Sequence, residues 1–258
     1  MKPFTRGPRL SDRLIHYTLS GAGNPSMDRW LGGGLALALL MTSIPASGVT
    51  FASGELSARY WHASPSGDLF HDGGGAANDV EADLGLDGEG QLDLYARLGL
   101  PLVTYDGYIT RIDYTGKADS GGSFGGAYSA GERTEFSIEL RHAGVMVNPL
   151  SFLDMLDAGL GLGLTGVDGE AAAGSNGDTK DALVLTGKAE LRAYLPATPW
   201  LAAVSYRGSD NLQDLSVEVG YRLMALLQAR AGYRRIRFDS SHFEGSVAGP
   251  FAGLSLAF

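Results

Sequence analysis

The stretch ALVLTGKAELRAYL, from Ala182 to Leu195, separates its apolar and polar side chains with a period of two. Its odd positions carry Leu183, Leu185, Gly187, Ala189, Leu191, Ala193 and Leu195, and its even positions carry Val184, Thr186, Lys188, Glu190, Arg192 and Tyr194. Successive side chains of a β-strand point to opposite faces, whereas a helix would distribute these charges around its circumference. The stretch is therefore predicted to be a strand with one apolar and one charged face.

The same alternation recurs along most of the chain after Gly54. It is clear in QLDLYARL (91–98), TEFSIELRHA (134–143), LDAGLGLGLTG (156–166) and DLSVEVGYRL (214–223). We expect about ten strands, at 55–62, 91–98, 103–115, 134–147, 153–167, 182–195, 200–207, 212–223, 226–238 and 250–258. The 38 glycines also favour a turn-rich sheet protein over a helical bundle.

The connections between these segments alternate in length. Long loops rich in Gly, Asp and Ser are expected at 63–90, 116–133, 168–181 and 239–249, and short links at 99–102, 148–152, 196–199 and 224–225. Only 208–211 is short where a long loop is expected. The pattern predicts an all-β fold, a closed antiparallel transmembrane β-barrel of about ten strands. A barrel of about eight strands is the variant, if 200–207 and 212–223 pair only weakly.

The apolar face of such a barrel points inward in a soluble protein and outward in an outer-membrane protein. A closed sheet has less room inside than outside, so we expect the many Leu, Val and Tyr side chains to face lipid. The charged residues would then meet in the lumen. This interior network is expected to contain Arg97, Arg111, Glu139, Arg141, Lys188, Glu190, Arg192, Glu218 and Arg222.

Barrels of about eight strands have interiors that side chains fill, and open channels appear at about 16–18 strands. We therefore expect no general diffusion pore here. The glycines at 159, 161, 163 and 220 are expected to leave local gaps for water or a small ion.

Aromatic residues gather near the ends of the segments, where aromatic girdles of membrane barrels meet the lipid headgroups. The residues assigned to the girdles are Tyr60, Trp61, Tyr105, Tyr108, Tyr114, Trp200, Tyr206, Tyr221 and Tyr233. The competing explanation is that Tyr and Trp are simply good strand residues.

The N-terminal part has the pattern of an export signal. Leu31–Gly48 is the most apolar run of the chain, follows Arg29 and ends in small residues. We expect a signal peptide at 27–48 and the barrel at 49–258, whereas 1–26 is a polar extension that fits a mis-assigned translation start. A transmembrane anchor is the alternative, although the run is shorter than the ~20 residues of a spanning helix.

The last residues, AGPFAGLSLAF, also form a strand pattern. Ala252, Leu254, Leu256 and Phe258 make an apolar stripe that ends on an aromatic residue. A terminal Phe in this register resembles the signal that the outer-membrane assembly machinery recognises. The resemblance implies that Phe258 is the assembly signal and that this machinery is a partner.

Four further motifs carry a resemblance to a family. They are ARYWHASPSGDL (58–69), DVEADLGLDGEGQLDLYARLGLPL (79–102), AGYRRIRFD (231–239) and GPFAGLSLAF (249–258). The mature chain resembles the "GlyGly" outer-membrane proteins in these motifs and in the order and spacing of the motifs. The stretches 116–133 and 168–181 resemble that family only in character. The resemblance implies a β-barrel in the bacterial outer membrane, with no catalytic residues and no defined substrate.

Composition narrows the functions further. The net charge of −9 argues against nucleic acid as a partner, and the absence of cysteine excludes disulfides and thiolate metal sites. The acidic run Asp79, Glu81, Asp83, Asp87 and Glu89 is explained better as a solvated loop than as a Ca²⁺ site. The stretch SSHFE (240–244) holds Ser, His and Glu, yet consecutive loop residues rarely form a catalytic triad.

We therefore expect a monomeric structural or interaction barrel, or a narrow channel, with no enzymatic activity, cofactor or metal. Its partners would be outer-membrane lipid and lipopolysaccharide. The alternatives are a lipid-modifying outer-membrane enzyme and a soluble periplasmic β-barrel that binds a ligand.

Overall fold

The computed structural model describes residues 52–69, 78–124, 127–152, 155–239 and 243–258. The polar extension expected at 1–26 and the signal peptide expected at 27–48 lie outside these residues, as does most of SSHFE. No helix in the described ranges has the length and apolar character needed to cross a membrane.

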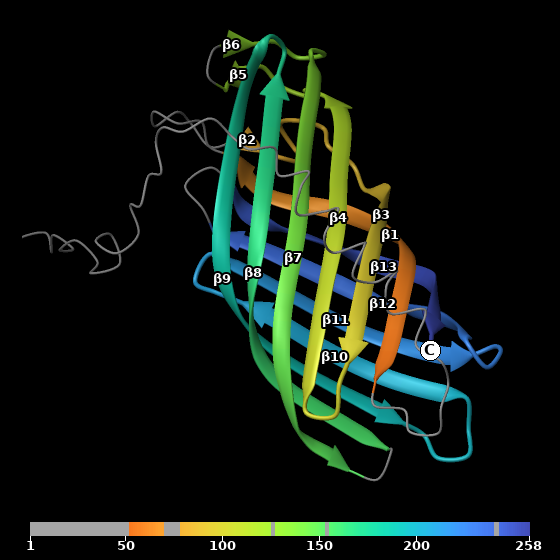
Figure 1. The fold of residues 1–258 in the computed structure, drawn as a ribbon. Helices are drawn as coiled ribbons and strands as arrows, with labels where there is room; N and C mark the ends of the chain where they lie inside the picture. Colours follow the sequence, from red (N-terminus) through yellow and green to blue (C-terminus); the bar gives the residue numbers. More distant parts are fainter. Residues whose placement is uncertain (1–51, 70–77, 125–126, 153–154, 240–242) are drawn as a thin grey trace, which may run out of the picture. The chain divides into compact units, whose positions relative to one another are not determined.

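The alternating segments form ten long antiparallel strands, each paired with its neighbours in sequence order (Figure 1). They are β1 (Ser53–Leu69), β3 (Glu89–Gly99), β4 (Val103–Lys117), β7 (Arg133–Phe152), β8 (Leu156–Ala173), β9 (Asn176–Tyr194), β10 (Trp200–Gly208), β11 (Leu212–Arg222), β12 (Leu227–Asp239) and β13 (Phe243–Ala257). The first and last strands pair from Glu55–Ala257 to Leu69–Phe243, which closes the barrel. Because β10 and β11 pair along their whole length, the eight-stranded variant is wrong.

Two of the expected long loops are instead mostly strand. Residues 168–181 continue β8 and β9 to a tight turn at 174–175, and β13 already begins at Phe243. The expected short link at 148–152 is likewise the end of β7, beyond a register shift between Val147 and Leu150. Small and polar side chains in these stretches satisfy a strand just as well as a loop, so composition alone did not separate the two.

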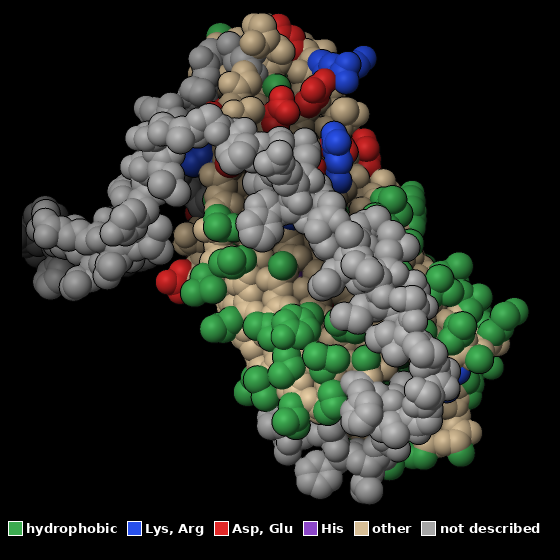
Figure 2. Space-filling model, viewed as in Figure 1, with side chains coloured by type: hydrophobic (Ala, Val, Ile, Leu, Met, Phe, Trp, Pro, Cys, Tyr) green, Lys and Arg blue, Asp and Glu red, His purple; other side chains and the backbone are tan. Residues whose placement is uncertain are grey.

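The outer surface carries a broad apolar band. Side chains on it are strongly exposed, among them Leu92, Leu94, Leu160, Leu162, Leu183, Leu185, Val217, Val219, Leu254 and Leu256. Figure 2 shows hydrophobic side chains over the middle and lower part of the visible face, and charged side chains near its upper end. A sheet with its apolar face on the outside and a polar interior is the arrangement of outer-membrane barrels, which places this protein in a bacterial outer membrane.

Exposed aromatic residues border the band at both ends. Tyr105, Trp200, Tyr221 and Phe258 lie near the start of β1, the C-terminus and the short turns, which is the periplasmic end of such barrels. Tyr60, Tyr206 and Tyr233 lie towards the opposite end. Trp61, Tyr108 and Tyr114 were wrongly assigned to these girdles. They are almost fully buried inside the barrel, at 1%, 4% and 1% exposure, because they occupy the inward positions of β1 and β4.

The facing of apolar side chains reverses along the tall strands. In the outer half of β7, Phe136, Ile138 and Leu140 are buried inside, while Glu135 and Glu139 are on the outer surface. Figure 1 shows β7, β8 and β9 rising to the end where β5 and β6 lie. These strands thus leave the apolar band and continue into a part of the barrel with a water-facing exterior and an apolar core. We call this part the extension.

Short elements cover this core. They are β2 (Asn78–Asp79), which pairs with β1, and the hairpin of β5 (Gly122–Ser123) and β6 (Ala127–Tyr128). Gly85 has φ +60°, and an added Cβ would lie 2.2 Å from the carbonyl oxygen of Lys117, so only glycine allows the cover to approach β4 this closely. Tyr128 donates a 2.8 Å hydrogen bond to Oδ1 of Asn78, and burial raises the pKa of its hydroxyl.

Candidate functional site

The barrel interior holds one continuous run of ion pairs, which we call the interior charge network. Acids and bases alternate along it without interruption, in the order Asp157, Arg97, Glu190, Arg192, Glu55, Arg230, Glu218, Arg59, Asp93, Arg234, Asp214, Arg207, Asp106 and Lys188. The carboxylates and cations are equal in number, so the network is neutral. The excess negative charge of the chain therefore lies outside it.

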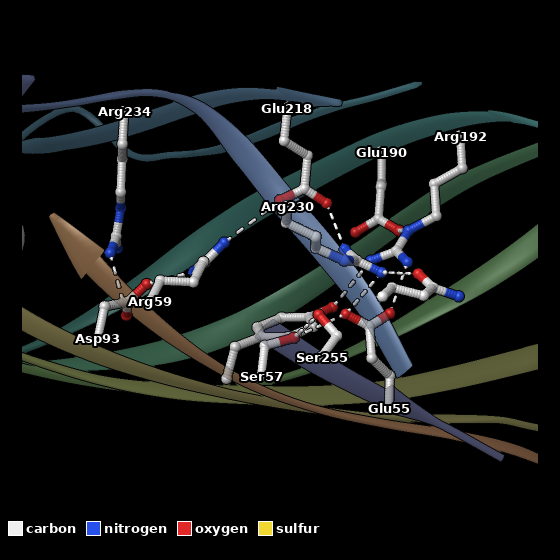
Figure 3. Close-up of polar contacts among 12 residues, drawn as sticks. Glu55, Ser57, Arg59, Asp93, Glu190, Arg192, Glu218, Arg230, Arg234 and Ser255 are labelled. Carbon is white, nitrogen blue, oxygen red and sulfur yellow. Dashed lines mark hydrogen bonds and ion pairs between the residues drawn. The ribbon is translucent and has the colours of Figure 1, made fainter. Parts of the chain in front are cut away.

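The network crosses the lumen because its members come from opposite walls. Glu55 on β1 lies 2.8 Å from Arg192 of β9 and 2.9 Å from Arg230 of β12 (Figure 3). Arg230 also pairs with Glu218, and Arg59 lies 3.5 Å from the same carboxylate (Figure 3). Beside Glu55, the hydroxyl oxygens of Ser57 and Ser255 are 2.6 Å apart, as neighbours across the adjacent strands β1 and β13.

A second set of contacts continues the network towards the outer end. Arg234 reaches Asp93 at 3.3 Å and Asp214 at 2.9 Å, and Arg207 lies 3.4 Å from Asp214 and 3.3 Å from Asp106. Lys188 completes the run as an ion pair with Asp106. Buried charges are costly unless they are paired and hydrogen-bonded, and this alternation supplies an opposite charge to each of them.

Aromatic rings pack against several of these cations. The guanidinium of Arg234 lies between two rings, 4.6 Å from the centroid of Tyr108 and 5.3 Å from that of Trp61. Arg59 stacks in the same way on Tyr95 and Phe251, at 5.5 and 5.0 Å. Cation–π contacts of this kind stabilise a desolvated guanidinium and fix its position in the lumen.

Little space remains within the network. The cavity between Arg59, Glu190, Arg207 and Glu218 has a volume of about 20 Å³. One water needs roughly 10–15 Å³ of such volume, so this cavity has room for about one water.

An apolar core closes the outer end of the lumen. The ring of Phe243 packs there against those of Phe136 and Phe238, with centroids 5.1 and 5.5 Å apart. Ile112, Leu140 and further residues surround them, all almost completely buried. In the described ranges, apolar side chains therefore occupy the lumen above the network.

The glycines of β8 do not leave the gaps that the sequence suggested. A Cβ on Gly163 would lie 2.3 Å from Cε1 of His142, and one on Gly159 would lie 2.6 Å from Oδ1 of Asn148. Long side chains of β7 therefore fill the space that the glycines provide. His142 is held there by a 2.9 Å hydrogen bond to Thr165 and by stacking on Tyr108.

Five of the charged residues expected in the lumen belong to the interior charge network. They are Arg97, Lys188, Glu190, Arg192 and Glu218. The other four were wrongly placed. Arg111, Glu139 and Arg141 lie on the outer surface of the extension, where the charged face of each strand points outward. Arg111 forms an ion pair with Asp113, and Arg141 forms ion pairs with Glu139 and Asp168. Arg222 is exposed at the periplasmic end of β11.

Several members of the network were missing from that set. Glu55, Asp106, Arg207, Asp214 and Arg230 each alternate with exposed apolar or small residues of their strands, so strand parity could have identified them. Their isolation in otherwise apolar or small-residue stretches concealed this signal.

The acidic and histidine side chains of the described ranges do not converge on a metal site. No group of three or more His, Asp or Glu side chains there is arranged to hold a metal ion. In the acidic loop, Oδ1 of Asp79 accepts hydrogen bonds from the backbone N–H groups of Glu81 and Ala82, and Asp83 accepts one from Asp79. These carboxylates therefore organise the turn that precedes β3.

No family model matches the sequence, and no curated protein matches it. Solved structures with a similar fold include Ail, the attachment invasion locus protein of Yersinia pestis, with 12% identity and a TM-score of 0.40 over 80% of this chain and 99% of that one. Neisserial surface protein A has 13% identity and a TM-score of 0.37 over 82% and 100%. The translocator domain of the autotransporter NalP from Neisseria meningitidis has 13% and 0.41 over 89% and 96%. At these values, none of them assigns a family or a function.

Proposed function

We propose that this protein is a closed outer-membrane barrel that anchors its extension at the cell surface and conducts no general flow of solutes. The observation that carries the proposal is the filled interior. Ion pairs span the lumen within the apolar band, and packed aromatic side chains close it above the band. A narrow channel is the weaker alternative, because the cavity inside the network has room for one water.

The extension is the part of the protein that fits an interaction role. It has its own buried core and a charged exterior, and one strand edge is open. β9 pairs with β10 only as far as Gly187–Gly208, so no described strand pairs on that side with residues 176–182, which lie beyond the apolar band. An open edge of this kind is where another polypeptide can add a strand.

We further propose that the chain is a member of the "GlyGly" outer-membrane family and is not an enzyme. The four motifs that resemble the family carry the first proposal. Supporting the second, His142 is held by Thr165 and Tyr108 inside the barrel, and His62 is exposed on β1. The soluble ligand-binding alternative does not fit the exposed apolar band, since such a surface would aggregate in water.

Liposome swelling tests the closed lumen. Liposomes that contain the refolded barrel are transferred into isotonic arabinose or sucrose, and the decrease of light scattering is followed against empty liposomes and against a porin. We expect the rates of empty liposomes for both sugars. Swelling at the porin rate would show an open lumen and would move the function to transport.

A further inference from the structure

A groove on the outer surface lies where β12, β13 and β1 leave the apolar band. It has a volume of about 280 Å³, and the side chains of Arg235, Arg237, Ser66, Ser246 and Glu244 line it. Arg237, Ser246 and Ser66 lie side by side across the three strands in register. We call this feature the β12 groove.

The two arginines of the groove differ from most of the other arginines in the described ranges. Of the arginines in the described ranges, all but Arg222, Arg235 and Arg237 form an ion pair. Arg235 and Arg237 are two positions apart on one strand, so both project outward and are exposed beside each other. They form a local concentration of positive charge on a protein whose net charge is −9.

The position of the groove relates it to the membrane surface. Arg235 is the next outward residue after Tyr233, an exposed aromatic residue at the outer border of the apolar band. Aromatic residues of this kind lie at headgroup level, so the groove lies where phosphate groups of the outer leaflet are expected. A guanidinium donates two parallel hydrogen bonds to a phosphate, and the hydroxyls of Ser66 and Ser246, 3.1 Å apart, provide further polar groups.

We propose that the β12 groove binds the phosphate group of an outer-leaflet lipid. Arg235 and Arg237 supply the charge, and the pair of serines lies between β13 and β1 at the floor of the site. Glu244 also lines the groove and, as a carboxylate, opposes an anion. Neutralisation of the two arginines should therefore weaken phosphate binding, and neutralisation of Glu244 should strengthen it.

The test titrates the folded protein, in a neutral detergent, with lipid A and measures the dissociation constant by calorimetry. We expect the double variant Arg235→Gln and Arg237→Gln to raise this constant about tenfold or more, since two charged hydrogen-bonding groups are lost. Glu244→Gln should lower it. The matched control, Arg111→Gln with Arg133→Gln, removes two exposed arginines that already have carboxylate partners and should leave it unchanged. Retention of the heat-modifiable band on cold gel electrophoresis checks that each variant is folded.

Two further probes distinguish the source of the phosphate. Dephosphorylated lipid A should bind the wild type as weakly as it binds the double arginine variant, and inorganic phosphate should compete poorly. Equal binding of lipid A by the wild type and the double variant would overturn the proposal. Competition by inorganic phosphate at the concentration of lipid A would overturn the assignment to a lipid.

Discussion

Arg234 and Asp214 form a bidentate pair inside the barrel, with 3.0 Å between Nε and Oδ1 and 2.9 Å between Nη2 and Oδ2. Both side chains are almost fully buried, at 2% and 1% exposure. The pair lies between the carboxylate of Asp93 and the guanidinium of Arg207, so it links the two halves of the interior charge network. Loss of either partner would leave a buried charge without its closest counter-charge.

Asp214→Asn should therefore be strongly destabilising. Removal of one partner of a buried ion pair costs about 3–5 kcal/mol, because the other charge stays desolvated. The free energy of unfolding in lipid bilayers, obtained by urea titration, measures this. Arg111→Gln is the control, since it breaks an exposed ion pair with Asp113 and should cost less than about 1 kcal/mol. Equal costs would show that Arg234 has access to water.

The reversal of facing in β7 predicts a contrast between two adjacent residues. Leu140 is fully buried in the core of the extension, whereas Glu139 is on its surface and pairs with Arg141. Leu140→Ala should lower the free energy of unfolding by about 2–5 kcal/mol, and Glu139→Ala by less than about 1 kcal/mol. The same titration in bilayers compares the two. A greater cost for Glu139→Ala would mean that the strand keeps its apolar face outward to its end.

The apolar band predicts a second contrast, along β9. Leu185 is 63% exposed within the band, and Thr179 is exposed on the same face of the strand beyond it. An Arg at the bilayer midplane costs about 2–4 kcal/mol in a barrel of this type, so Leu185→Arg should be destabilising. Thr179→Arg should stay within about 0.5 kcal/mol of the wild type, as exposed substitutions in water usually do. Similar costs at both positions would contradict the proposed extent of the band.

The C-terminal residue connects strand closure with assembly. Gly54 and Phe258 exchange two backbone hydrogen bonds, of 2.6 and 2.9 Å, and the ring of Phe258 lies over Gly54, where a Cβ would approach Cε2 to 2.3 Å. Deletion of Phe258, or Phe258→Asp, should reduce the amount of folded protein in the outer membrane. Phe258→Tyr is the conservative control. Wild-type amounts of the heat-modifiable band for the deletion would contradict this prediction.

The fold could be predicted from the sequence because alternation is a local property. Leu185, Val217 and Leu254 each oppose a polar or small residue, and the strands that contain them lie where the alternation placed them. The position at which the apolar band ends is not a local property of the sequence. Phe136, Ile138 and Leu140 alternate with charged and polar residues, and so does Leu191, which lies between Glu190 and Arg192. Only the height of each strand relative to the membrane decides which face is apolar. This is why Arg111, Glu139 and Arg141 were placed inside.

The interior network could be predicted only in part for a related reason. Lys188, Glu190 and Arg192 follow one another on one strand and stand out as a row. Asp106, Asp214 and Arg230 are each the single charge in a short stretch, and each pairs with charges that lie on other strands. Their pairing depends on barrel closure and register, which the sequence pattern does not give.

The central claim is that the lumen is closed, and single-channel recording in planar bilayers tests it most directly. The refolded wild-type barrel is inserted, as confirmed by its heat-modifiable band, and the current is recorded at fixed voltages in potassium chloride. We predict no steady conductance and at most small, brief openings, because the interior charge network and the aromatic core above it fill the lumen. A steady conductance of porin size from the wild-type protein would contradict the closed barrel.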